Sequence, residues 1–120
     1  MPKSAVVLIL AALFLCGCSH NAAPIQDGKY YAVFLTNGGV YFGQLSGFGT
    51  PYPVLTDVYY VRDSVNQEAK VAASTLIKRG REWHSPDRMI LNEKAIAFIE
   101  PVGKDSRVYK LIEESKKKPN

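Results

Sequence analysis

The chain has 120 residues, enough for one domain, and carries 15 Lys and Arg against 11 Asp and Glu. From Lys29 to Gly103 there are eight basic and seven acidic residues, whereas Lys104 to Asn120 holds six and three. Because the basic excess lies in a short tail, the charge does not predict nucleic-acid binding. Both cysteines fall within the first 18 residues, which excludes a disulfide framework or a cysteine-based metal site in the rest of the chain.

The first 18 residues have the features of an export signal. Lys3 precedes an apolar run of 11 residues from Ala5 to Leu15, whereas a helix needs about 20 residues to cross a bilayer. The run ends in Leu15-Cys16-Gly17-Cys18, which resembles the lipobox of bacterial lipoproteins: an aliphatic residue, two small residues and the modified cysteine. The resemblance implies cleavage before Cys18 and lipid attachment to its thiol. An ordinary cleaved signal peptide and an uncleaved anchor are the alternatives.

Residues 19–28 are polar and aperiodic, and we expect them to form a flexible tether. A flexible coil of this length has an end-to-end distance of roughly 17 Å, which would keep the domain close to the lipid surface. The residue after Cys18 is Ser19 and not Asp. In this respect the chain resembles lipoproteins that two-membrane bacteria send to the outer membrane. We therefore expect a protein of the bacterial cell envelope that is lipid-anchored to a membrane, the outer one if the organism has one.

The body of the chain, residues 29–103, begins with a predicted β-hairpin. Two apolar, aromatic-rich runs between Tyr30 and Phe48 flank Asn37-Gly38-Gly39, and Asn-Gly between such runs is the strongest short-range hairpin signal. Gly43 interrupts the second run, where we expect a bend or a bulge. Both faces of the hairpin are largely apolar, which predicts strands covered on two sides or one face left for a partner.

Three further strands are predicted from runs rich in β-branched and aromatic residues, and a short one is expected in addition. They cover Val54–Arg62, Arg88–Asn92 and Ile96–Val102, with the short one at Thr75–Arg79. Asp63–Ser74 is polar and Ala-rich, and we expect a loop with one or two helical turns. Residues 104–120 are expected to form a basic, partly disordered tail, with a short strand or helix up to Glu114 and disorder from Ser115 onward.

The body resembles an Sm-like or SH3-like small barrel. The match runs through VFLTNGGVYFGQLSGF, VLTDVYYV and RMILNEKAIAFIEPV, over about residues 30–102. It implies an all-β fold, a small five-stranded barrel at 29–103 that follows the signal peptide. Sm proteins read RNA with an Asp and an Asn after the second strand and with an Arg-Gly turn between the last two. This chain has GFGTPYPV and Asn92-Glu93-Lys94 at those places, so we expect no nucleic-acid partner.

The body carries no recognisable catalytic, cofactor-binding or metal-binding motif. Its one histidine, His84, stands near Ser85 and Asp87, and neighbouring loop positions do not make the geometry of a catalytic triad. There is no paired spacing of metal ligands and no glycine-rich phosphate loop followed by a helix and a lysine. We therefore expect a protein that is not an enzyme and holds no cofactor or metal.

The remaining signal is aromatic, at 11% of the chain. Packing of the core and sheet explains most such residues, and the sharper hypothesis is a recognition surface, because Tyr, Trp and Arg dominate binding hot spots. The candidate partner-binding residues are Trp83, Arg81, Phe34 and Phe42.

We expect a non-enzymatic binding or scaffold module that is anchored to a membrane through Cys18. Its partner would be an unknown envelope protein or polymer. The alternative is a structural envelope protein that self-assembles into ring-like homo-oligomers through the edge strands of its barrel.

Overall fold

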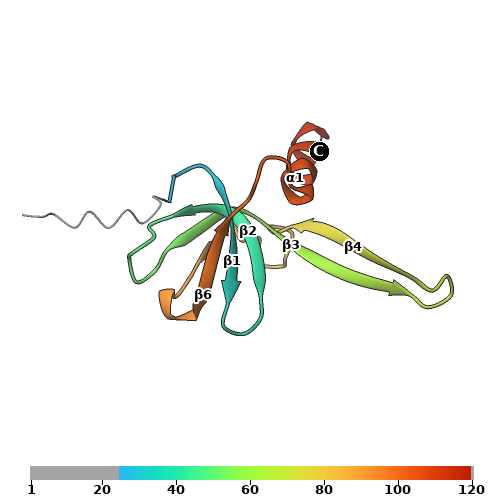
Figure 1. The fold of residues 1–120 in the computed structure, drawn as a ribbon, viewed down its shortest axis with the longest axis horizontal. Helices are drawn as coiled ribbons and strands as arrows, with labels where there is room; N and C mark the ends of the chain where they lie inside the picture. The colour runs from blue at the N-terminus through green and yellow to red at the C-terminus, as the bar shows by residue number, and fades with distance from the viewer. Residues whose placement is uncertain (1–24, 120) are drawn as a thin grey trace, which may run out of the picture.

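The computed structural model describes residues 25–119, which form a six-stranded antiparallel sheet and one helix (Figure 1). The signal sequence, Cys18 and most of the expected tether lie outside the described residues. Among the described residues, no helix is long and apolar enough to cross a membrane. The strands are β1 (Tyr30–Leu35), β2 (Val40–Ser46), β3 (Val54–Asn66), β4 (Val71–Lys78), β5 (Arg88–Ile90) and β6 (Ile96–Pro101); a 3-10 turn, η1 (Glu93–Ala95), precedes β6, and α1 spans Arg107–Lys117.

The predicted opening hairpin is confirmed. β1 and β2 pair with Tyr31 opposite Gly43 and Phe34 opposite Val40. Gly38 has a φ of +88°, a conformation that glycine adopts without steric cost. The Asn37 side chain supports the turn by accepting a hydrogen bond from the Gly39 N–H at 2.9 Å. The local sequence signal and the structure agree here because the turn depends only on residues within it.

The bend expected at Gly43 is present as an irregularity in the β2–β3 pairing. Phe42 faces Tyr59 and Gln44 faces Thr56, so Gly43 alone stands opposite two residues of β3. One of these two, Asp57, has a φ of +49°. Such a two-against-one arrangement is a β-bulge, which bends and twists the strand.

The loop with helical turns expected at Asp63–Ser74 is wrong. β3 continues to Asn66 and β4 begins at Val71, so both strands extend into a long hairpin in register from Tyr59 opposite Lys78 to Asn66 opposite Val71. We call its outer part, residues 62–75, the arm. The arm projects away from the rest of the domain (Figure 1), and all of its residues are exposed. The prediction failed because Ala and Ser are poor strand formers, and pairing with β3 overrides their local preference.

The sheet is open. Its order is β4-β3-β2-β1-β6, and β5 pairs with the first part of β3. The chain crosses from β5, beside β3, to β6, beside β1, through η1 alone. Hydrogen bonds anchor this crossing: the Leu91 and Glu93 N–H groups donate to the carbonyls of Pro53 and Pro51, at 2.8 and 3.0 Å. The fold is therefore mostly β, as expected, but a closed five-stranded barrel is not what the strand pairing shows.

The curled sheet encloses one core cluster on its inner face. Alternate residues of the first strands meet there, together with Leu91 from the segment before η1. Its buried members are Tyr31, Val33, Leu45, Leu55, Val58 and Leu91.

The outer face of the same strands holds a second core cluster, closed by α1. Ile112 of the helix is fully buried and packs with Tyr30 and Tyr59. The Ser106 hydroxyl caps the helix by accepting the Tyr109 N–H. Two apolar faces were predicted, and α1 is the cover for one of them. The helix also includes Ser115 to Lys117, which we expected to be disordered.

Candidate functional site

The candidate residues from the sequence do not gather into one surface. Cys18 lies outside the described residues. Phe42 packs against the outer core cluster beneath α1, and Phe34 stacks on Phe98 of β6 with ring centroids 4.2 Å apart. Trp83 and Arg81 lie on the β4–β5 loop. The aromatic signal therefore divides between core packing, one stacked pair and one isolated loop.

Trp83 is fully exposed on a loop of fixed shape. The Glu82 carboxylate holds this loop by accepting hydrogen bonds from the Arg79 side chain and from the Gly80 N–H, both at 2.8 Å. The hydrogen bond from Arg79 lowers the pKa of Glu82 to about 2, so the carboxylate stays charged across the ordinary pH range. Trp83 itself exposes its whole side chain to solvent.

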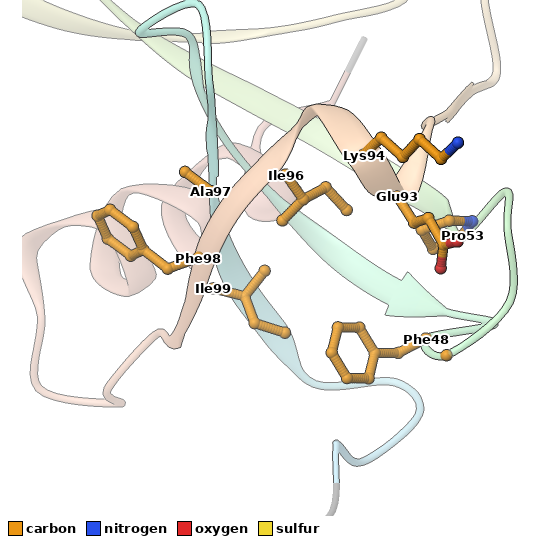
Figure 2. A pocket seen from close by; sticks show the side chains of 9 residues that line it. Phe48, Pro53, Glu93, Lys94, Ile96, Ala97, Phe98 and Ile99 are labelled. Carbon is orange, nitrogen blue, oxygen red and sulfur yellow. The ribbon is translucent and has the colours of Figure 1, made fainter.

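An apolar groove of about 440 Å³ runs beside β6. Figure 2 shows Ile96 and Ile99 projecting from β6 toward Phe48, while Ala97 and Phe98 lie on the other side of the strand. Pro53 forms part of the opposite wall, and Glu93 and Lys94 of η1 stand at one end. The groove lies where the open sheet leaves a gap between β6 and the β2–β3 loop.

Two large aromatic side chains are unusually exposed at this groove. Phe48 is 56% exposed and Phe98 is 51% exposed. The Phe34 ring supports Phe98 from β1 at an interplanar angle of 18°, so the exposed ring has a fixed position. Rigid aromatic side chains around an apolar hollow are the usual anchors of protein interfaces.

Among residues 25–119, β6 is an edge strand, and its outer edge adds little hydrogen-bonding capacity to the groove. The Val102 N–H donates to the Tyr30 carbonyl, so Val102 directs its backbone groups toward β1. Along an antiparallel strand, such residues alternate with residues whose backbone groups point away from the partner strand. Ile99 therefore directs its backbone groups away from β1. Pro101, the next outward position, has no N–H, and the register shifts between Phe34 and Leu35 opposite Ala97. Both features limit strand pairing at this edge, so the groove offers mainly side chains for contact.

The edge of β4 is different. The Arg79 N–H donates to the Val58 carbonyl, so by alternation Ala72, Ser74, Leu76 and Lys78 direct their backbone groups away from β3. No proline or register shift interrupts these positions. Within the described part of the chain no strand pairs with this edge.

A cluster of polar side chains joins α1 to the sheet. The Tyr30 hydroxyl donates to the Asp57 carboxylate, which also pairs with Lys78 at 3.3 Å. Burial, followed by the hydrogen bond to Asp57, raises the pKa of Tyr30 to about 12. Lys116 of α1 lies over the Tyr30 ring at 5.0 Å, and its interaction with Tyr30 raises the pKa of Lys116 to about 12. Tyr30 therefore stays protonated and acts as a hydrogen-bond donor. The cluster connects α1 to strands β1, β3 and β4.

The residues that line the groove indicate what kind of ligand it can accept. Its two charged residues, Glu93 and Lys94, both lie on η1, and the other lining residues are apolar or glycine. Across residues 25–119 there is no group of three or more His, Cys, Asp or Glu side chains that could hold a metal ion. The groove is suited to accept an apolar side chain or a short apolar segment.

Four groove residues were not predicted from the sequence: Phe48, Phe98, Ile96 and Ile99. Alternation along Ile96–Ile99 signals a strand, but no local pattern indicates that the β2–β3 loop folds toward it. A scan of the sequence against known protein families finds no match, and no curated protein matches it either.

Proposed function

We propose that the protein is a lipoprotein of the bacterial cell envelope, anchored through Cys18, whose non-enzymatic domain binds an envelope protein in the groove beside β6. Export and anchoring are supported by the short apolar run that ends at Leu15-Cys16-Gly17-Cys18. Binding is supported by one observation above all: Phe48 and Phe98 flank an apolar groove and expose more than half of their surface. Large exposed apolar side chains around a hollow mark interaction sites.

We further propose that the domain is a small barrel related to the Sm-like and SH3-like architectures, with the β5–η1–β6 crossing in place of strand pairing at the gap. The groove occupies that gap. Partner binding at the gap would cover the residues of the inner core that lie closest to solvent, such as Ile96 and Ile99.

Lipid anchoring is tested by replacing Cys18 with alanine and labelling cells with an alkyne fatty acid. The wild-type chain should take up the label, and Cys18→Ala should not and should remain as precursor or be released. Equal labelling of the two chains would refute the lipoprotein assignment.

Partner binding is tested with a photo-crosslinking amino acid placed in the anchored protein at Phe98, and separately at Val65 on the arm. Both side chains are exposed, so Val65 is a matched control for random collision. We expect a discrete adduct from position 98 that Phe48→Ala weakens, and none from position 65. Equal adducts from both positions would contradict a specific groove.

Self-assembly is the second candidate function, and the uninterrupted β4 edge favours it. Ring formation through edge strands would need β6 of one copy to accept β4 of the next, and Pro101 limits that acceptor. Size-exclusion chromatography of residues 18–120 with Cys18→Ser separates the two candidates. A discrete oligomer that Ala72→Pro dissolves, and Ala72→Val keeps, would favour assembly, because only proline removes an outward N–H. A monomer favours the binding module.

A further inference from the structure

The chain enters the domain at the end of the sheet that also carries α1. β1 starts where β6 finishes, because Tyr31 pairs with Pro101 and the Val102 N–H donates to the Tyr30 carbonyl. The segment before β1 and the segment that leads into α1 therefore leave the sheet side by side. Figure 1 shows both at the same end of the sheet, opposite the turn that joins β1 to β2.

A hollow of about 430 Å³ lies between these two segments, and three lysines are among its lining residues. Lys29 comes from the segment where the chain enters, Lys104 from the linker before α1 and Lys116 from α1 itself. The acidic Glu113 also lines the hollow and pairs with Lys116 at 3.5 Å. The excess charge here is positive.

The outward face of α1 continues this positive surface. Ile112 marks the buried side of the helix. Arg107, Lys110, Glu114 and Lys117 follow at intervals of three and four residues, which places them on one stripe, and all four are exposed. Lys118 follows the helix and is exposed as well. The stripe together with Lys118 thus presents four basic groups and one acidic group to solvent.

The length of chain before the domain limits how far this surface can lie from a membrane. Seven peptide links separate Cys18 from Ile25, and a fully extended chain of that length spans at most about 25 Å. Ile25 itself is held, since it packs against the inner core, and the next residue's N–H donates to the Tyr31 hydroxyl at 2.8 Å. Lipids on Cys18 would therefore keep Ile25, at this end of the domain, within about 25 Å of the bilayer.

We propose that the basic stripe of α1, with Lys29 and Lys104, docks on the anionic phospholipid headgroups of the membrane that holds the anchor. The proposal rests on the proposed attachment at Cys18, and charge complementarity supplies the recognition. Docking would fix the orientation of the domain relative to the membrane.

The test uses residues 18–120 with Cys18→Ser, which retains both core clusters and lacks the lipid. We expect this protein to sediment with vesicles that contain phosphatidylglycerol and not with phosphatidylcholine vesicles, and we expect salt to weaken binding. Removing three charges from the stripe, as R107Q/K110Q/K117Q, should lower the partition coefficient on the order of 100-fold. The matched control R62Q/K70Q/R81Q removes the same charge from exposed sites on the arm and the β4–β5 loop, and it should bind like the unsubstituted protein.

Two outcomes would overturn the proposal. Equal loss in the two triple variants would mean that net charge alone drives the binding. No binding to either vesicle would show that α1 does not recognise headgroups. Fatty-acid labelling of Cys18 in cells is measured separately, so failure of docking and failure of anchoring are distinguishable.

Discussion

Gly43 and Asp57 face each other at the irregular step of the β2–β3 pairing, and each has a separate constraint. A Cβ on Gly43 would lie 2.8 Å from both the Thr56 carbonyl oxygen and the Leu55 Cγ. Asp57 holds a positive φ and uses its carboxylate to accept the Tyr30 hydroxyl. The bend in the sheet therefore depends on glycine at position 43, where a side chain does not fit, and on the side chain of Asp57.

Gly43→Ala should destabilise the domain by about 1–3 kcal/mol, because the new methyl group collides with backbone that cannot move freely. Thermal unfolding should show a decrease in Tm of about 4–8 °C for each kcal/mol. Gly103→Ala is the control, since no atom lies within 4 Å of a Cβ at that position. Identical melting of the two variants would show that Gly43 is not closely packed.

The raised pKa of Tyr30 predicts how the stability of the domain changes at alkaline pH. Its pKa in the folded protein is about 12, above the ordinary value of 10.0, so the folded state holds the proton more tightly. The resulting stabilisation is complete below pH 10 and is lost as the pH rises toward 12. Urea denaturation across this range should show a shallower loss in Tyr30→Phe than in the wild type. Tyr52→Phe, at an exposed site, should follow the wild type, and an equally steep loss in Tyr30→Phe would refute this assignment.

The role of α1 could not be read from the sequence. The segment resembles a basic tail because few of its residues are apolar, and only Val108, Tyr109 and Ile112 pack in the outer core cluster. The hairpin at Asn37-Gly38 was predictable because its signal is local. The cover on the outer face was not, because it depends on a tertiary contact between Ile112 and strands far away in the sequence.

Ile112→Ala should therefore cost about 2–5 kcal/mol, since it empties a fully buried site. Lys110→Ala on the exposed face is the control and should change stability by less than about 0.5 kcal/mol. Chemical denaturation monitored by tyrosine fluorescence reports both values. A small effect of Ile112→Ala would mean that α1 is not part of the cooperative unit.

At the scale of the whole molecule, the domain has a packed body and an arm without a core. A mostly β fold was predictable from strand composition, whereas the arm was missed because its polar, Ala-rich sequence has no apolar face to bury. The groove could not be predicted from the sequence either, because its lining joins the β2–β3 loop, which carries Phe48, to the distant strand β6. The β1–β2 turn, which has a strong local signal, could be predicted, whereas the arm and the contacts between distant segments could not.

Shortening the arm should leave the body stable. Replacing residues 63–74 with Asn-Gly lets Arg62 and Thr75, a cross-strand pair, flank a two-residue turn. Because the removed residues are all exposed, the free energy of unfolding should change by less than about 1 kcal/mol. Circular dichroism during thermal unfolding measures this, and loss of the folded state would show that the arm supports the body.

The pairing of β1 with β6 determines when the domain can fold. Tyr31 and Pro101 meet although they lie 70 positions apart, and α1 follows β6. Such distant contacts form slowly, because a long loop must close before they are rewarded. Neither core cluster is complete until nearly the whole chain is present. If the chain crosses a membrane N-terminus first, as we propose, neither cluster can be completed until Leu91 and Ile112 have also crossed.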